Sequence, residues 1–396
     1  MENLRIITNT DPKKGPTTLN CNPNLTHYVI PVHDPLWFEF RTTGIPGVYD
    51  SGIGASECYK TLQTEPEQYE PVLPQMLEQK AGISPVKRRM TAPMLAGILH
   101  EKTILNIWQY YDGTHDGHLQ NFMDNDKKRE FGTVNAYIVN KNYPWLFVSL
   151  DAYIKKGYHA LNGLVLEEHS PLECKTIGFQ AARSHEGGIP KSYIYQIQQQ
   201  MLVTETDYAE MAILENGSQF KVLFFESNQI IQEQILEATY KNWMLVKQMR
   251  ALKEERDNYR LAGKHESAQN IDHHIQNILP LPGAGEAYAE YYTDKHNPQE
   301  GSFIQGTEDH LEAIRNRQLY TELSKLWADE AESIDNKFRD IFVKKQVNVI
   351  DFDKLGKLKF TKRTNGKNYF PDYSSIKQKA DKSRVKIIFN DQLGML

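Results

Sequence analysis

The feature that most constrains the fold is an alternation, from Tyr28 to about Glu226, between short apolar runs and amphipathic stretches. The short runs are rich in Val, Ile, Phe and Tyr, as β-strands are, whereas the amphipathic stretches repeat apolar residues at helical spacing. Strands that alternate with helices predict an α/β fold in which helices flank a mixed central β-sheet. The expected strands are 133–139, 145–154, 164–167, 172–176, 211–215 and 220–226, and the expected helices are 55–63, 93–111 and 193–204.

The residue pattern of the sequence changes after Ser227. Residues 230–278 carry charged and apolar residues at helical spacing, with no proline and a single glycine, Gly263, which predicts one or two long helices. Leu-Pro-Leu-Pro-Gly at 279–283 ends them, and a second helical stretch is expected from about Glu308 to Lys345. We therefore predict an N-terminal arm over 1–30, an α/β domain over 31–228, a helical extension over 229–345 and a basic C-terminal segment over 346–396.

The composition of the chain excludes several classes of protein. The three cysteines, Cys21, Cys58 and Cys174, are scattered and form no CxxC pair, which argues against a zinc ribbon, a disulfide framework or an iron–sulfur cluster. No stretch approaches the roughly 18 to 20 apolar residues that cross a bilayer, and the N-terminus lacks the apolar core of a signal peptide. We therefore expect a cytoplasmic protein that has no membrane partner.

Charge is distributed unevenly along the chain. The net charge is −5, but residues 344–396 contain 13 Lys or Arg against 5 Asp or Glu, a local balance of +8, so the remaining residues carry −13. A basic segment suits contact with a nucleic-acid backbone. The acidic remainder is compatible with DNA as a partner if its carboxylates include a metal site.

The clearest chemistry lies in Asp151 and in the segment Glu173-Cys174-Lys175. Side chains alternate along a strand, so Glu173 and Lys175 project to one face while Cys174 points to the other. Asp151 ends an apolar run of strand character, and we expect it beside Glu173 on a neighbouring strand. Taken alone, these residues are also compatible with solvated polar side chains at strand ends.

Two carboxylates that meet at one point repel each other unless a cation joins them. Mg²⁺ suits such a site because it prefers oxygen ligands and keeps several waters, and Mn²⁺ can substitute for it. One of these waters becomes the nucleophile on a phosphodiester, while Lys175 orients it or neutralises charge on the phosphate. We predict that Asp151, Glu173 and the backbone carbonyl of Cys174 bind the metal.

Four further blocks accompany these residues in order along the chain: WFEFR at 37–41, GIGASE at 52–57, MLAGILHE at 94–101 and YQIQQQMLVT at 195–204. Together with Asp151 and Glu173-Cys174-Lys175, they resemble the YqaJ-like viral recombinase family, the lambda-exonuclease group of the PD-(D/E)xK nuclease superfamily. The resemblance covers about residues 37–204. It implies a restriction-endonuclease-like core, which in this chain carries a helical C-terminal extension.

The resemblance also implies roles for two helical residues. Glu101 is expected to face the metal site as a further ligand, and Gly97, on the same face of its helix, permits close packing. Gln196 and Gln198 match the Q-x-Q of the family's active-site helix. Residues two apart on a helix diverge by about 200°, so only one of them can face the centre. We predict that Gln198 does so and that Gln196 is a packing or capping residue.

In the same family, the Arg and Ser of the first two blocks form a pocket for a 5′-phosphate, which makes Arg41 and Ser56 candidates here. Arginine offers a planar fork of donors that suits phosphate oxygens. An ordinary surface arginine is the alternative for Arg41. Residues 42–51 lengthen the path from Arg41 to Ser56 relative to the family pattern.

The implied activity is that of a Mg²⁺-dependent DNA exonuclease, which digests one strand of duplex ends in the 5′ to 3′ direction for phage-type recombination. A single-strand annealing protein as a partner and a homo-oligomeric state are implied in the same way. The alternatives are an endonuclease or defence-associated nuclease of the same superfamily, and a non-catalytic DNA-binding or assembly protein on that fold. The complete set of Asp, Glu and Lys favours an enzyme.

Overall fold

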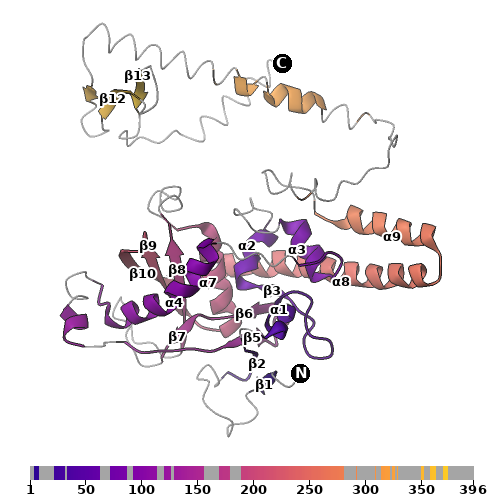
Figure 1. The fold of residues 1–396 in the computed structure, drawn as a ribbon, viewed down its shortest axis with the longest axis horizontal. Coiled ribbons are helices and arrows are strands. Elements are labelled where there is room, and N and C mark those ends of the chain that lie inside the picture. The colour runs from indigo at the N-terminus through magenta and orange to yellow at the C-terminus, as the bar shows by residue number, and fades with distance from the viewer. Residues whose placement is uncertain are drawn as a thin grey trace. The chain divides into compact units, whose positions relative to one another are not determined.

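Two five-stranded sheets, with the helices that cover them, make up most of the described part of the computed structural model (Figure 1). The chain divides into two units, Met1–His296 and Asn297–Leu396. In the first unit the structure describes residues 4–8, 22–31, 34–62, 72–86, 92–113, 120–125, 129–155, 169–178, 189–280 and 291. In the second unit it describes residues 308, 314–321, 323–325, 328, 349–351, 357–362 and 369–372.

The first sheet has the strand order β1-β2-β5-β6-β3. Its neighbouring strands are antiparallel except β3 and β6, which run parallel. All five residues of β5 are buried, so both faces of the sheet are covered at that strand. The strands are β1 (Arg5–Thr8), β2 (Leu25–Val29), β3 (Ile53–Gly54), β5 (Ala136–Asn140) and β6 (Leu146–Val148).

The second sheet has the strand order β10-β9-β8-β7-β4, with β8 at its centre. Strand β8 runs parallel to β9 and antiparallel to β7, and the other pairs are antiparallel. The strands are β4 (Phe131–Gly132), β7 (Ala152–Ile154), β8 (Ser170–Ile177), β9 (Tyr208–Glu215) and β10 (Gln219–Glu226). Both sheets therefore mix parallel and antiparallel strands, as the expected α/β fold requires.

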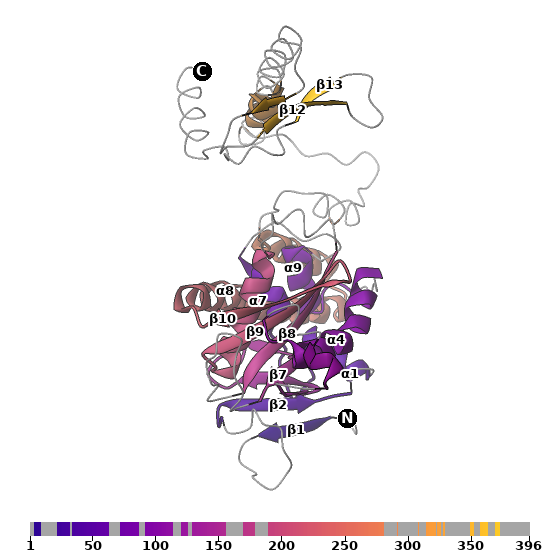
Figure 2. The same ribbon diagram turned by 90° about the vertical axis from the view of Figure 1, so that its left-hand side faces the viewer.

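Two helices cover opposite faces of the second sheet, α4 (Ala92–Tyr110) and α7 (Lys191–Thr204) (Figure 2). The alternation of side chains along β9 shows this directly. Ala212 packs in one cluster with Trp108 of α4, whereas the preceding residue, Met211, packs in another with Ile197 of α7. Because β8 runs parallel to β9, its side chains divide between the two helices in the same way.

Helix α7 also contacts the first sheet. Leu202 and Val203 share a core cluster with Ile138 of β5 and Val148 of β6. The side chain of Gln199 is buried, and its amide donates to the carbonyl of Ile53 at 2.9 Å and to that of Phe147 at 3.2 Å. Helix α7 therefore joins the two sheets through apolar packing and hydrogen bonds.

Four short helical elements lie near the first sheet. Helix α1 begins after Asp34, whose side chain accepts from the Leu36 amide at 2.9 Å, and Pro35 occupies its first turn. Element η1 leads directly into α2, in agreement with the helix expected over 55–63. The bounds are α1 (Pro35–Arg41), the 3₁₀ helix η1 (Ala55–Glu57), α2 (Cys58–Thr61) and α3 (Leu73–Lys80).

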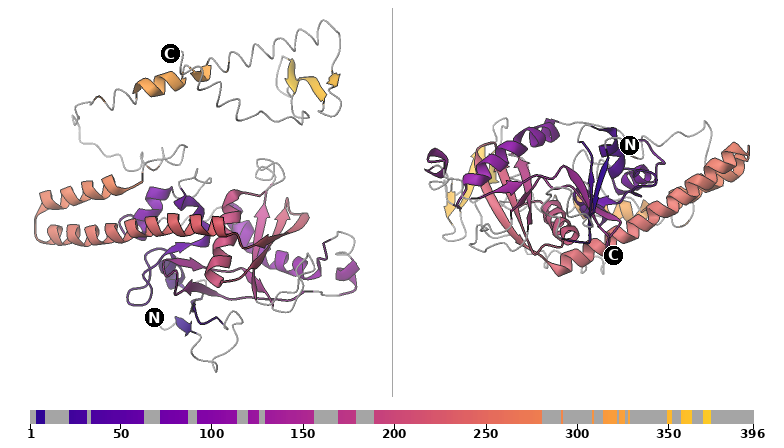
Figure 3. Two further views of the ribbon diagram at one scale, coloured as in Figure 1. Left: turned by 180° about the vertical axis from the view of Figure 1, so that it is seen from behind. Right: turned by 90° about the horizontal axis from the view of Figure 1, so that it is seen from below.

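The long helical region after the second sheet consists of α8 (Gln229–Leu261) and α9 (His265–Ile278), seen from behind in Figure 3. Asn228 caps α8 by accepting from the Ile231 amide at 3.1 Å. The two helices separate at Gly263, whose φ of +71° is a left-handed conformation that glycine adopts readily. The expectation of one or two long helices is therefore confirmed, with the break at the single glycine.

The expected α/β arrangement is confirmed, although the strands divide between two sheets. Helix α8 does not stand apart from the α/β core, because Ile235, Trp243 and Val246 belong to the largest core cluster. The four predicted segment boundaries remain predictions. The strand expected over 164–167 and most of the helical stretch expected over 308–345 lie outside the described residues.

The second unit contains a small antiparallel sheet with the order β11-β12-β13. The strands are β11 (Val349–Asp351), β12 (Lys357–Lys362) and β13 (Tyr369–Asp372). The basic C-terminal segment therefore contains paired strands. Throughout the described part of the chain, every helix is too short or too polar to span a bilayer.

The buried His27 predicts acid sensitivity of the first sheet. It lies in β2 and is only 2% exposed, and burial lowers its pKa from 6.5 to about 4. Between pH 6.5 and pH 4, the unfolded chain therefore binds a proton that the folded chain does not. The free energy of unfolding decreases as the pH is lowered through this window, by up to about 3 kcal/mol.

Urea unfolding of the wild type and His27→Phe at pH 7, 5.5 and 4.5 measures this effect. We expect the free energy of unfolding of the variant, relative to that of the wild type, to rise as the pH is lowered. A difference between the two proteins that does not change with pH would contradict the assignment.

Candidate active site

The site is built on two neighbouring strands of the second sheet. Strand β7 pairs with β8 so that Ala152 lies opposite Leu172, which places Asp151 next to Glu173. The backbone amide of Cys174 donates to Asp151 Oδ2 at 2.8 Å and fixes the carboxylate at the strand edge. The aspartate and the glutamate, 22 positions apart in sequence, therefore meet through strand pairing.

Glu173 faces α7, as the alternation along β8 requires, and 3% of it is exposed. Its Oε1 accepts from Lys175 Nζ at 2.7 Å and from Gln196 Nε2 at 2.6 Å, while its Oε2 accepts from Gln200 Nε2 at 2.6 Å. Charge-assisted hydrogen bonds of this kind are about twice as strong as neutral ones, so the carboxylate is held firmly.

Lys175 lies in the same group of contacts. Its Nζ also donates to Gln196 Oε1 at 2.9 Å and lies 4.7 Å from the centre of the Tyr193 ring. Burial by itself lowers the pKa of Lys175, but the charges of Glu173 and Asp151 outweigh it and raise the pKa above its usual value. Lys175 is therefore a fixed cation beside two carboxylates.

The prediction that Gln198, and not Gln196, faces the centre is wrong. The Gln198 amide donates to the carbonyl of Glu226 at 2.8 Å, and its oxygen accepts from the Asn228 amide at 2.8 Å, so it holds the start of α8. The prediction relied on the pattern Q-x-Q, which admits either residue. The helix turn that faces β8 selects Gln196 and, one turn further on, Gln200.

The different contacts of Gln196 and Gln198 predict different effects when each is replaced by leucine. We expect Gln196→Leu to reduce DNA cleavage by roughly tenfold to a hundredfold, because residues that orient a site's charged groups contribute on this scale. Gln198→Leu is the matched variant on the same helix, and we expect it to lower thermal stability while cleavage per folded molecule stays near the wild-type rate. Equal activity losses in the two variants, after correction for folded protein, would contradict the assignment.

Asp151 lies in surroundings that disfavour its charged form. Burial raises its pKa well above the usual range, the charge of Glu173 raises it further, and Lys175 opposes the shift. Glu101 on α4 is partly buried, and burial followed by the charge of Glu173 raises its pKa as well. Three carboxylates therefore influence one another electrostatically, and the Lys175 ammonium opposes their effect on Asp151.

The donor set fits a divalent cation. Among the described residues, no group of three or more His, Cys, Asp and Glu side chains is close enough to hold a metal, which leaves two carboxylates at the centre. Mg²⁺ is typically bound by one or two carboxylates together with waters and substrate phosphates, so Asp151 and Glu173 suffice. A dication would also relieve the repulsion that raises the pKa of Asp151. Glu101 contributes charge to this region from α4.

A second group of residues surrounds Arg41 and Ser56. Arg41, at the end of α1, donates through Nη2 to Ser56 Oγ of η1 at 3.0 Å, so the structure brings the two predicted pocket residues together. Glu57, the next residue, accepts from the Gly54 amide at 2.9 Å and pairs with the buried Lys80 at 2.9 Å. Burial by itself raises the pKa of Glu57, but Lys80 and Arg41 lower it overall.

Sequence reasoning missed three residues of these groups. Tyr193 and Gln200 share the face of α7 that carries Gln196, since they lie three residues before it and four after it. Helical spacing counted from Gln196 would have identified both. Lys80 was not identifiable, because only the tertiary fold brings α3 to η1 and α1.

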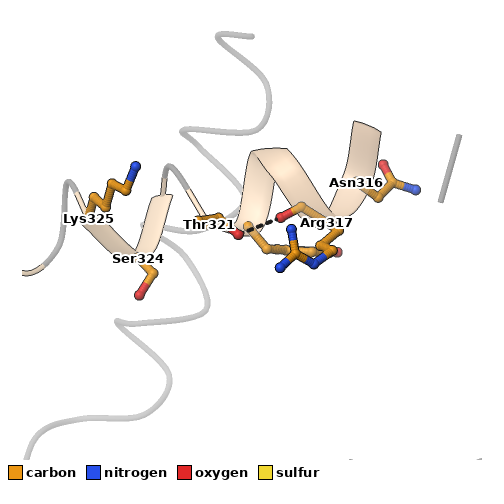
Figure 4. Close-up of a pocket in the computed structure, with 6 residues that line it drawn as sticks. Asn316, Arg317, Thr321, Ser324 and Lys325 are labelled. Carbon is orange, nitrogen blue, oxygen red and sulfur yellow. Dashed lines mark hydrogen bonds between the residues drawn. The ribbon is translucent and has the colours of Figure 1, made fainter. Parts of the chain in front are cut away.

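Two hollows lie elsewhere on the described surface. One, of about 730 Å³, belongs to the second unit, and its lining contains no carboxylate, so it offers no acidic metal ligand (Figure 4). It is lined by Asn316, Arg317, Tyr320, Thr321, Ser324 and Lys325. The other, of about 700 Å³, lies between residues 43–50, the end of α3 and the C-terminal half of α8.

The mixed second sheet brings an aspartate, a glutamate and a lysine together on adjacent strands, the arrangement that the resemblance to the PD-(D/E)xK nucleases predicts. Residues 36–207 match the model of the YqaJ-like viral recombinase domain. The predicted resemblance is therefore confirmed. The family supports a nuclease that acts in phage-type recombination.

The chain was also compared with individual proteins. No curated protein matches it. Among solved structures, the alkaline exonuclease LHK-Exo from Laribacter hongkongensis is 14% identical, with a TM-score of 0.35, and the match covers 52% of this chain and 94% of that one. A complex of LHK-Exo with dAMP gives 14% identity and a TM-score of 0.36 over the same shares. A phage-related exonuclease from Haemophilus somnus 129PT is 12% identical, with a TM-score of 0.25, covering 50% of this chain and 96% of that one.

Proposed function

We propose that the protein is a divalent-metal-dependent DNA exonuclease that acts at duplex ends in the 5′ to 3′ direction. The observation that carries this proposal is the arrangement of Asp151, Glu173 and Lys175: strand pairing places Asp151 beside Glu173, which forms an ion pair with the Lys175 ammonium at 2.7 Å. Asp151, Glu173 and the carbonyl of Cys174 would hold Mg²⁺, for which Mn²⁺ can substitute. When bound, the cation supplies an activated water and stabilises charge on the phosphate.

The protein's own side chains supply positioning and charge. Lys175 remains protonated beside Glu173 and can donate to an attacking water or to a phosphate oxygen. Gln196 contacts both Glu173 and Lys175, so it keeps the acid and the ammonium in one arrangement. Gln200 holds the second oxygen of Glu173. Helix α7 therefore orients the group that acts on the scissile phosphodiester.

The pairing of Arg41 with Ser56 supports end-dependent cleavage. A guanidinium and a hydroxyl 3.0 Å apart present several donors to one anion, which suits a terminal 5′-phosphate. Such a pocket would position a strand by its end and favour digestion in the 5′ to 3′ direction. Duplex DNA ends are the proposed substrate, and a homo-oligomer and a single-strand annealing partner are part of the same proposal.

The proposal is tested with linear duplex DNA that carries a 5′-phosphate or a 5′-hydroxyl, alongside closed circular DNA, in Mg²⁺ or in EDTA. We expect loss of linear DNA only, in Mg²⁺ only, with faster digestion of phosphorylated ends. Lys175→Ala should lower the rate by about 10²-fold or more, as removal of a charge-stabilising donor does elsewhere.

The same experiment distinguishes the alternative functions. Cutting of the closed circle would replace the exonuclease with an endonuclease of the same superfamily. DNA binding without cleavage in any metal would favour an assembly protein. Equal digestion of phosphorylated and hydroxyl ends would leave an exonuclease but overturn the pocket at Arg41 and Ser56.

A further inference from the structure

Helix α8 lies beyond residues 36–207, yet one of its arginines reaches the surroundings of Arg41. Arg250 makes five hydrogen bonds, in which every nitrogen of its guanidinium takes part. The acceptors are the carbonyls of Thr43, Asp50 and Lys80 and the carboxylate of Asp50. Its planar group also lies over the ring of Trp243, 5.1 Å from the ring centre. Figure 3 shows how far α8 extends along the first unit.

Three of these four acceptors belong to the segment 42–51, the extra length between Arg41 and Ser56 noted in the sequence. This segment is tightly folded: the Ser51 hydroxyl donates to the Thr42 carbonyl at 2.8 Å, and Ile45 and Tyr49 form a bridge. Gly44 has a φ of +84°, and a Cβ there would meet the Tyr49 carbonyl oxygen at 2.4 Å. Arg250 therefore binds a loop whose conformation is fixed by its own internal contacts.

Lys80 connects this loop to the predicted phosphate pocket. Arg250 donates to the Lys80 carbonyl through two nitrogens, at 3.2 Å and 2.7 Å. The buried ammonium of Lys80 donates in turn to the Arg41 carbonyl at 2.8 Å and pairs with Glu57 at 2.9 Å. Arg41 donates to Ser56, and Glu57 directly follows Ser56 in the sequence. A continuous set of polar contacts thus runs from α8 to both sides of the pocket.

We propose that Arg250 is a positioning residue for the Arg41–Ser56 pocket and thereby determines how strongly the protein prefers a 5′-phosphorylated end. The inference rests on the proposed function of that pocket. It gives α8 a role in substrate selection, in addition to its packing in the core. Lysine cannot replace Arg250, because a single ammonium group cannot reach acceptors on 42–51 and on α3 in the fixed fork of a guanidinium.

Equilibrium binding of a DNA duplex with a 5′-phosphate or a 5′-hydroxyl, measured in EDTA to prevent turnover, tests the inference. The variants are Arg250→Gln and Arg250→Lys, and the matched control is Arg256→Gln. Arg256 lies on the same helix and makes comparable ion pairs, at 2.9 Å to Asp257 and 3.0 Å to Asp272, but it contacts no residue of 42–51 in the described structure. Thermal unfolding of every variant records the loss of stability separately.

We expect both Arg250 variants to lose most of the preference for the phosphorylated end, by about tenfold, which corresponds to about 1.4 kcal/mol. Affinity for the hydroxyl end should stay near the wild-type value, and Arg256→Gln should keep the full preference. Digestion in Mg²⁺ should show the same pattern as a raised KM for phosphorylated ends at similar kcat.

Three outcomes would overturn the inference. Full preference in Arg250→Lys would exclude the guanidinium as its cause, and an equal loss in Arg256→Gln would reduce the effect to helix stability. A wild type without any preference would remove the pocket itself, and with it the proposed end recognition. Because the wild type alone decides this last case, failure of the proposed function is distinguished from failure of the role of Arg250.

Discussion

Replacing Asp151 with asparagine is expected to lower metal-dependent DNA cleavage by about 10³-fold, since loss of a metal-binding carboxylate removes several kcal/mol of charge stabilisation. The fold should survive the change. Asparagine is nearly isosteric and can still accept from the Cys174 amide, which lies 2.8 Å from Asp151 Oδ2. Burial and the charge of Glu173 raise the pKa of Asp151, so loss of its charge should even relieve repulsion in the absence of metal.

Single-turnover cleavage of linear duplex DNA, with urea unfolding of the same preparations, measures both effects. Asp207→Asn provides a control, because Asp207 is exposed at the turn after α7. We expect that control to cleave at the wild-type rate. A fully active Asp151→Asn variant, or one that is inactive only because it is unfolded, would contradict the role given to Asp151.

The second large effect concerns a buried ion pair on the far side of the second sheet. Arg129 Nη1 lies 2.7 Å from Glu210 Oε2, which also accepts from Trp108 Nε1 at 2.8 Å, and the guanidinium lies over the Trp108 ring. Arg129→Met would leave the carboxylate of Glu210, fully buried in β9, without its guanidinium. Removal of one partner from a buried pair destabilises a protein by about 3–5 kcal/mol.

Chemical denaturation of four proteins tests this expectation: the wild type, Arg129→Met, Glu210→Gln and the double variant. The double variant should recover much of the stability that Arg129→Met loses, because no uncompensated charge remains and the amide oxygen introduced by Glu210→Gln can still accept from Trp108. Additive losses in the double variant would show that the pair is not coupled. Cleavage per folded molecule should change little, since neither residue belongs to the site.

Much of the fold could be predicted because it follows from local sequence. The alternation of apolar runs and amphipathic stretches indicated β8, β9, β10, α4 and α7, and helical spacing after Ser227 indicated one or two long helices, where the structure has α8 and α9. The division of the strands between two sheets could not be predicted in this way. It depends on α7 lying between them, where Gln199 binds the carbonyls of Ile53 and Phe147.

The site could be predicted where two residues share one strand, as Glu173 and Lys175 do. The choice between Gln196 and Gln198 could not be made from their spacing alone, because it depends on which turn of α7 faces β8. Contacts between elements distant in sequence were equally inaccessible. Arg250 lies 200 positions after Asp50, and only the packing of α8 brings them together.

Anomalous diffraction from Mn²⁺-soaked crystals shows whether Asp151 and Glu173 bind a divalent metal. We predict one Mn²⁺ peak between the two carboxylates, at about the 2.0–2.2 Å typical of such ions and oxygen ligands, and no peak there in Asp151→Asn crystals. An active protein whose Mn²⁺ peak lies elsewhere, or is unchanged in Asp151→Asn, would show that these two carboxylates do not form the metal site.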